Sequence, residues 1–298
     1  MMSRATIAVL GTGLLGRAIA ERCHAVGHTV IVFNRTPSKA LPLQRQGIAV
    51  VSAAELAVSQ ADCVLLLLTD ADAIRNVLLT PACSAALHGK MIVQMGTIAP
   101  GESLDIQRRV EQCGGAYCEA PVLGSLAEAT AGTLFVMVGS TEAQFAAWSL
   151  LFRSLGRDPR RTGPVGSAAA LKLALNHLIA AEMSAFALSL GLVQRSEVSV
   201  ETFMAVLRES ALYAPTFDKK LPRLLKRDYH RPNFSTRHLL KDVRLFCREA
   251  ALRGLATDSL EGLPLMLARA IEQGLGDQDY SALFEIVNPQ DPLQKKKA

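Results

Sequence analysis

The sequence predicts an α/β domain with a doubly wound, mostly parallel sheet, followed by an all-α domain, with a long helix joining the two. Short β-branched apolar runs alternate with helical segments through the first half of the chain. Strand signals then stop at Ser167, where helical periodicity begins and continues almost to the C-terminus. We therefore expect a sheet domain over 1–164, a long interdomain helix over 165–194 and a helical domain over 195–298.

Composition narrows the classes of function. The chain has 298 residues, half of them hydrophobic, which suffices for two domains with sizeable cores. A net charge of +5 without a basic arm argues against a nucleic-acid partner and suits phosphate or carboxylate ligands. Six cysteines without CxxC pairs and six histidines without a ligand pattern predict neither disulfides nor a metal. Met1–Arg4 leads directly into a predicted strand and leaves no room for a signal peptide, and the apolar run Val64–Leu68 is too short to span a bilayer. We therefore expect a soluble, cytoplasmic protein without a membrane partner.

The first predicted strand, Ala5–Leu10, runs directly into a glycine-rich turn. The turn has the spacing GxGxxG, made by Gly11, Gly13 and Gly16 with Leu14 and Leu15 between them, and a helix is expected over Arg17–Ala25. At a strand-to-helix turn these glycines allow a tight bend and let backbone N–H groups approach a pyrophosphate. The segment therefore predicts a dinucleotide site.

The second predicted strand, His28–Phe33, ends in Asn34, Arg35 and Thr36. A site for NAD commonly has an acidic residue here to bind the ribose hydroxyls. An arginine can instead bind a 2′-phosphate, with Asn34 and Thr36 donating hydrogen bonds. The sequence therefore favours NADP over NAD.

The later strands end in polar tips. The strand in Ala61–Asp70 ends near Leu68 and Thr69, and the strand in Lys90–Thr97 ends at Thr97. Thr97 is either a helix cap or a ligand contact. Further strands are expected over Ala116–Glu119 and Leu134–Val138. Between these lies Pro121–Ser125, a loop whose N–H groups suit an anion.

The long helix, expected over Ala168–Gln194, carries Lys172 and Asn176 four residues apart among apolar neighbours. One interpretation is a lysine that extends from a buried helix to solvent. The other is an ammonium beside a carboxamide, placed to transfer a proton. Further helices are expected around Val200–Glu209, Phe217–Lys226, Arg237–Arg253, Leu260–Gln273 and Ser281–Ile286, and a frayed tail over Asp291–Ala298.

Five blocks of the sequence resemble the β-hydroxyacid dehydrogenase family, which includes 3-hydroxyisobutyrate dehydrogenases and glyoxylate or succinic semialdehyde reductases. These blocks are Gly11–Gly16 with Asn34–Thr36, Glu119–Leu134, Gly163–Asn176, Phe234–Asp242 and Asp279–Ala282. The resemblance implies a Rossmann domain, a long helix and an all-α domain that makes a homodimer or homotetramer. It also implies roles for single residues: catalysis by Lys172 with Asn176, cofactor contacts by Thr97, Phe234 and Lys241, and substrate contacts by Thr97, Lys172 and the loop Leu123, Gly124 and Ser125.

The sequence departs from the family pattern at Leu123, where the family has a serine in its Pro-Val-Ser-Gly loop. We expect an NADP-dependent oxidoreductase that interconverts a short hydroxyacid and its semialdehyde or keto acid. Lys172 would act as general acid and base, which requires a pKa lowered from about 10.4 toward roughly 7–8. Two alternatives are an imine reductase-like enzyme and a non-catalytic NADP-binding module for oligomerisation.

Overall fold

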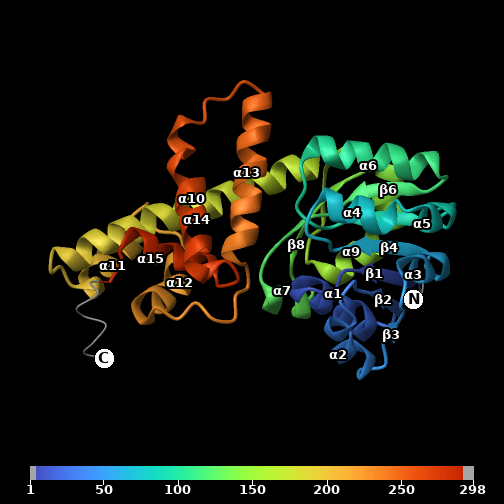
Figure 1. Cartoon of the computed structure of the whole chain (residues 1–298), viewed down its shortest axis with the longest axis horizontal. Coiled ribbons are helices and arrows are strands. Elements are labelled where there is room, and N and C mark those ends of the chain that lie inside the picture. Colours follow the sequence, from blue (N-terminus) through green and yellow to red (C-terminus); the bar gives the residue numbers. More distant parts are fainter. Residues whose placement is uncertain (1–4, 291–298) are drawn as a thin grey trace. The chain divides into compact units, whose positions relative to one another are not determined.

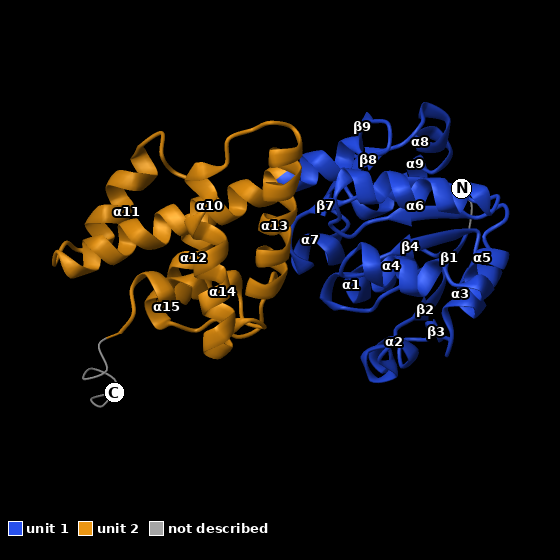
Figure 2. Cartoon of the chain, turned by 45° about the horizontal axis from the view of Figure 1, so that its top comes forward, with its two compact units in different colours: residues 1–173 blue, residues 174–298 orange. Residues whose placement is uncertain are grey.

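The computed structural model describes residues 5–290 and divides into two compact units. Unit 1 ends at Leu173 and unit 2 begins at Ala174 (Figure 2). The change of unit falls within one continuous helix, α10 (Ser167–Arg195). The predicted domain boundaries stay a prediction, and the predicted tail over 291–298 lies outside the described residues.

Unit 1 is built on one sheet, whose described strands follow the order β3-β2-β1-β4-β5-β6-β8-β7, with β9 beside β8. The strands from β3 to β6 are parallel, whereas β8 runs antiparallel to β6 and β7. The bounds are β1 (Thr6–Leu10), β2 (Thr29–Phe33), β3 (Ala49–Val50), β4 (Cys63–Leu66), β5 (Met91–Gln94), β6 (Ala116–Glu119), β7 (Val122–Leu123), β8 (Phe135–Gly139) and β9 (Arg160–Gly163). This sheet confirms the predicted mostly parallel, doubly wound architecture.

Two apolar cores lie on the two faces of the sheet. Successive residues of β1 alternate between them: Ile7 and Val9 pack into one core, and Ala8 and Leu10 into the other. Because both faces are covered, the central strands are apolar throughout, as parallel strands usually are. This explains why these strands stand out in the sequence.

Helices cover both faces of the sheet (Figure 1). The core on one face takes side chains from α1, α2, α7 and α9, and the core on the other takes them from α3, α4, α5 and α6. The bounds are α1 (Leu14–Ala25), α2 (Leu41–Gln44), α3 (Ala54–Gln60), α4 (Ala71–Leu78), α5 (Pro81–Ala85), α6 (Pro100–Gln112), α7 (Leu126–Ala131), α8 (Glu142–Ala147) and α9 (Ser149–Leu155), with a 3₁₀ turn at Pro37–Lys39.

Three strands were not predicted. β3 and β7 have two residues each, and β9 has the polar sequence Arg-Arg-Thr-Gly, so none of them shows an apolar run. The prediction of a loop over Pro121–Ser125 is wrong at its centre, because Val122 and Leu123 pair with β8 as β7. The first helix begins at Leu14 rather than Arg17, since the chain turns helical directly after Gly13.

Unit 2 is helical, as predicted. Its helices after α10 are α11 (Val200–Glu209), α12 (Pro215–Lys226), α13 (Thr236–Leu252), α14 (Gly262–Ala270) and α15 (Phe284–Val287), with 3₁₀ turns at Asp258–Leu260 and Tyr280–Leu283. The predicted helix over Leu260–Gln273 is shorter, because the chain passes into a kinked π-helical turn, Ile271–Leu275, where Gly274 has a φ of +83°. Met183, Phe186 and Leu190 of α10 pack into the core of the unit, and Phe186 stacks on Phe217 with ring centroids 4.5 Å apart.

Helix α10 is also, among the described residues, the one helix long and apolar enough to cross a membrane by length and composition alone. A core helix of a folded domain meets the same criterion, and α10 contributes side chains to the core of unit 2.

Candidate functional site

The glycine-rich turn of unit 1 is packed closely on two sides. Gly11 has a φ of +102°, and a Cβ there would lie 2.5 Å from the carbonyl oxygen of Leu67. A Cβ on Gly16 would lie 2.0 Å from the carbonyl oxygen of Gly11. Gly13 differs, because a Cβ there would meet nothing within 4 Å. The first and third glycines therefore allow the turn to form, and the second faces open space.

No side chain among residues 5–290 caps the start of α1. Gly13 stands at the N-cap without a side-chain hydrogen bond, and the first turn, which begins with Leu14 and Leu15, has no acidic residue. The buried hydroxyl of Thr12 has no hydrogen-bond partner among the described residues. Free amides, a positive helix end and open space at Gly13 fit the pyrophosphate of a dinucleotide.

Asn34, at the end of β2, connects the two predicted cofactor loops. Its Oδ1 accepts a hydrogen bond from the N–H of Thr12 at 2.9 Å, and its Nδ2 donates to the carbonyl oxygen of Thr36 at 2.9 Å. In this structure Asn34 therefore holds the loops together rather than offering its amide to a ligand. Arg35 and Thr36 are exposed beside it.

The tips of β4 and β5 lead into helices. Leu68 and Thr69 lie between β4 and α4, and Asp70 caps α4 by accepting from the N–H of Ala73 at 2.8 Å. Thr97 does not cap α6, because Ala99 holds the N-cap position and donates its N–H to the Glu102 carboxylate at 2.8 Å. The capping interpretation of Thr97 is thus wrong, and a contact with the ligand stays a prediction.

Part of the hydrogen-bonding capacity of the loop after β7 is used by α7, the helix that follows it. The N–H of Ser125 donates to Oε2 of Glu128 at 2.8 Å, and the Ser125 hydroxyl donates to the same oxygen. This forms a capping box at the start of α7 and uses the Ser125 amide. Leu123 is half-buried, and Gly124 is exposed with a φ of +144°.

Helix α10 carries Lys172 about one turn from its start, in a half-buried position. Asn176, one turn later, is 2% exposed. Its Nδ2 donates to Oδ2 of Asp242 at 2.7 Å, and its buried Oδ1 accepts no hydrogen bond within the described chain. The Asn176 oxygen is therefore left for a ligand or for another side chain.

Asp242 was not assigned a role from the sequence. It is buried on α13, where it binds Asn176 and forms a salt bridge of 2.9 Å with Lys241. The sequence carries a weak signal, because Asp242 lies three residues after the apolar Leu239 and next to the apolar Val243 on a predicted helix. A buried acid on a helix requires partners, which here are the Asn176 amide and the Lys241 ammonium.

Phe234 precedes α13 and packs within unit 2. Its ring meets the edge of Tyr280 with centroids 5.9 Å apart, and its carbonyl oxygen accepts from the N–H of Tyr280 at 3.1 Å. The predicted C-terminal block around Asp279 thus supports the segment that positions Phe234.

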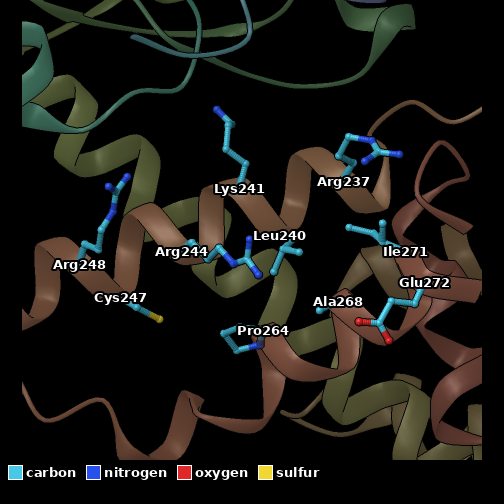
Figure 3. A pocket seen from close by; sticks show the side chains of 10 residues that line it. All are labelled: Arg237, Leu240, Lys241, Arg244, Cys247, Arg248, Pro264, Ala268, Ile271 and Glu272. Carbon is cyan, nitrogen blue, oxygen red and sulfur yellow. The ribbon is translucent and has the colours of Figure 1, made fainter. Parts of the chain in front are cut away.

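A groove lined by several basic side chains runs along α13 (Figure 3). Its volume is about 820 Å³, and it is lined by residues of α13 and by residues from Pro264 to Glu272. Arg237, Lys241, Arg244 and Arg248 recur along α13 at helical spacing, and Lys241 and Arg248 extend to the same side of the helix. Such a face attracts anions.

The thiols and the metal-ligating side chains can be located in the structure. All six cysteines are free thiols. Within residues 5–290 no three or more His, Cys, Asp or Glu side chains gather in a way that could hold a metal ion.

Comparison with known families gives two matches that together cover most of the chain. Residues 6–166 match the NAD-binding domain of 6-phosphogluconate dehydrogenase. Residues 166–287 match the NAD-binding domain of NADP-dependent 3-hydroxyisobutyrate dehydrogenase.

Individual proteins are similar over the same range. Glyoxylate/succinic semialdehyde reductase 1 of Arabidopsis thaliana is 30% identical over 289 residues, which cover 94% of this chain and 98% of the relative. The human cytokine-like nuclear factor N-PAC is 27% identical over 280 residues, and the chain spans half of its length. The 3-hydroxyisobutyrate dehydrogenase of Mycobacterium tuberculosis has a similar fold, with a TM-score of 0.85, 24% identity and coverage of 95% and 99% of the two chains.

Proposed function

This chain belongs to the β-hydroxyacid dehydrogenase family, and from that premise we propose that it interconverts a short hydroxyacid and its semialdehyde or keto acid with NADP(H). The coarser activity, an NAD(P)-dependent hydroxyacid dehydrogenase, follows from membership of the family. The observation that carries the finer proposal is Lys172, half-buried in the first turns of α10 and one turn before the buried amide of Asn176.

The choice of NADP rests on the segment after β2. No acidic residue stands between Asn34 and Thr36, and Arg35 is exposed. A guanidinium can bind a 2′-phosphate through two hydrogen bonds, whereas it offers the ribose hydroxyls of NAD no acceptor.

The bound cofactor supplies or accepts the hydride. In reduction, the ammonium of Lys172 donates a proton to the oxygen on which negative charge develops, and in oxidation the neutral amine takes it back. Asn176 orients the reacting hydroxyl through Oδ1, because its Nδ2 is held by Asp242. Gly124 and its neighbours would receive the substrate carboxylate.

Small aldehyde acids are the proposed substrate class. The relative from Arabidopsis thaliana is named for glyoxylate and succinic semialdehyde, both of which carry a carbonyl and a carboxylate. A reductase assay across such acids, with 3-hydroxyacids for the reverse direction, identifies the preferred substrate.

Two other functions are less well supported. The resemblance associates Lys172 with the hydroxyacid dehydrogenases rather than with imine reductases, so Lys172 argues against an imine reductase-like enzyme. A non-catalytic oligomerisation module would need neither Lys172 nor the bond that holds Asn176 to Asp242.

The Lys172→Ala variant tests the proposal. Turnover should fall by roughly 10²–10⁴-fold, which is the usual contribution of general acid–base catalysis, while the Kd for NADPH stays close to the wild-type value. Steady-state kinetics and a fluorescence titration of NADPH measure the two quantities. Lys219→Ala, which removes an exposed lysine of α12, is the matched control. Near-wild-type turnover in Lys172→Ala would contradict the assignment.

A further inference from the structure

Glu119 is a buried carboxylate for which neither the family resemblance nor the proposed reaction gives a role. It is the last residue of β6 and is 2% exposed. Its Oε1 accepts three backbone hydrogen bonds, from the N–H groups of Gly166, Ala168 and Ala169 at 2.8, 2.7 and 3.0 Å. Because these amides belong to the start of α10, Glu119 caps that helix from a distant strand.

The surroundings of Glu119 leave room for its carboxylate. Gly139 of β8 lies opposite Glu119 in the sheet, and a Cβ on Gly139 would come within 2.4 Å of Oε1. On β5 the residue in register is the neutral Gln94, whose side chain bonds to Gly96. A larger side chain on β8 would therefore displace the carboxylate from α10.

The second oxygen of Glu119 is also satisfied. Ser103 of α6 donates its hydroxyl to Oε2 at 2.6 Å, and the Tyr117 hydroxyl lies 2.9 Å from the same Ser103 oxygen. With Tyr117 donating to Ser103, every bond of the network delivers a hydrogen toward the carboxylate. This pattern fits the ionised form, which can only accept.

The titratable neighbours of Glu119 on β6 are Tyr117 and Cys118. Burial raises the pKa of both, so both are neutral at physiological pH. Burial also raises the pKa of Glu119, and the hydrogen bonds from Ser103 and the α10 amides oppose that rise. The first two turns of α10 contain one charged side chain, Lys172.

Lys172 lies on α10 about one turn after this cap. It follows Ala168 by four residues and Ala169 by three, and helical side chains lean toward the N-terminus of their helix. The free end of a helix has a partial positive charge that disfavours an ammonium nearby, and a carboxylate at that end offsets it.

We propose that Glu119 is a positioning residue for Lys172: its bonds fix the first turn of α10, and its negative charge stabilises the protonated lysine. This inference rests on the proposed role of Lys172 as general acid and base.

Two variants separate charge from geometry. Glu119→Gln keeps the shape but removes the charge, so the protonated lysine becomes less favoured. In the reductive direction kcat/KM falls as the pH rises through the pKa of Lys172. We call this decline the alkaline limb of the pH profile, and in Glu119→Gln it should move to lower pH by roughly 0.3–1 unit.

Glu119→Asp keeps the charge but is one methylene shorter, so it cannot reach all three amides. Its kcat should fall roughly tenfold to a hundredfold with the limb near the wild-type pH, and the KM for NADPH should be unchanged in both variants.

The control is Glu102→Gln, which removes one carboxylate from the start of α6 in the same unit and should leave the limb in place. Lys172→Ala identifies the limb, since that variant should lack it. If Lys172→Ala lowers turnover and Glu119→Gln leaves the limb at the wild-type pH, the inference about Glu119 is overturned and the proposed function stands. If Lys172→Ala turns over normally, the proposed function itself has failed. If circular dichroism shows that Glu119→Gln does not fold, the kcat of Glu119→Asp decides instead. A wild-type kcat in Glu119→Asp would overturn the inference.

Discussion

Arg35 is the residue on which cofactor preference depends. It is exposed directly after β2, where its side chain has room to meet a phosphate. Its backbone neighbours are held in place by the two hydrogen bonds of Asn34. A guanidinium in a fixed loop loses less freedom on binding than one in a loose loop, which favours a strong contact.

We predict that the wild-type enzyme prefers NADPH over NADH and that Arg35→Ala removes most of the preference. A hydrogen bond to a charged group contributes about 1.5–3 kcal/mol, which corresponds to roughly a ten- to hundredfold preference. Measuring kcat/KM for both cofactors in both proteins tests this. Arg45→Ala, an exposed arginine of the same unit, should change nothing. Equal efficiencies with the two cofactors in the wild type would refute the prediction.

Leu123 stands where the family has a serine, and the structure removes one candidate to replace that serine. The Ser125 hydroxyl already donates to Glu128, and so does the Ser125 amide. Leu123 is half-buried and is not among the side chains that form the core of unit 1. A role in substrate preference is therefore more plausible for Leu123 than for Ser125.

We predict that Leu123→Ser lowers the KM for glyoxylate or succinic semialdehyde roughly tenfold, because a hydroxyl adds a hydrogen bond to the substrate carboxylate. The KM for NADPH should stay constant. Leu150→Ser, at an exposed leucine of α9, is the control. An unchanged order of substrates in Leu123→Ser would show that Leu123 does not determine specificity.

At the scale of elements, the long strands and helices were predictable, whereas contacts between them were not. The apolar runs of β1, β2, β4 and β5 and the periodicity of α10, α11 and α13 are local signals. The start of α6 was ambiguous, since its N-cap is an alanine and the cap is completed by Glu102. The same holds for the candidate site. The GxGxxG turn and Lys172 could each be recognised from a short stretch of sequence. The contact between Asn176 and Asp242 could not, because these residues are 66 positions apart and meet only through helix packing.

The contacts between α12 and the segment Asp279–Ala282 also depend on packing between distant parts of the chain. Lys220 of α12 forms a buried salt bridge with Asp279 at 2.7 Å, and its ammonium lies 4.1 Å from the centre of the Tyr280 ring. Asp279 also accepts from the N–H and hydroxyl of Ser281. Removing the lysine would leave a buried carboxylate without its counter-charge.

We predict that Lys220→Met destabilises the protein by about 3–5 kcal/mol, the usual cost of removing one partner from a buried ion pair. Urea unfolding followed by circular dichroism, at one fixed protein concentration, measures the change. The neighbouring exposed Lys219→Met should have almost no effect. A midpoint in Lys220→Met equal to that of the wild type would contradict the prediction.

For the whole molecule, the exposed face of α10 bears on assembly. Leu178, Leu188 and Leu192 are 52%, 54% and 68% exposed. At about 100° per residue they fall within roughly 80° of one side of the helix. An apolar stripe of this kind is typical of a surface that binds another protein.

We predict a homodimer or homotetramer made through unit 2, which the double variant Leu188→Glu/Leu192→Glu should break into smaller species because it places charges in the apolar contact. Multi-angle light scattering at micromolar concentration measures the mass of each. Leu104→Glu, at an exposed leucine of α6, should keep the wild-type mass. A monomeric wild type would disprove the prediction.

The two hydrogen bonds of Asn34 also limit how cofactor preference can be redesigned or can evolve. The usual first substitution toward NAD would put an aspartate at position 34, directly after β2. An aspartate could still accept from the N–H of Thr12, but it could not donate to the carbonyl oxygen of Thr36. Such a variant would gain a partner for the ribose and lose the support of the neighbouring loop in the same step. Laboratory evolution toward NADH should therefore accept changes at positions 35 and 36 before any change at position 34.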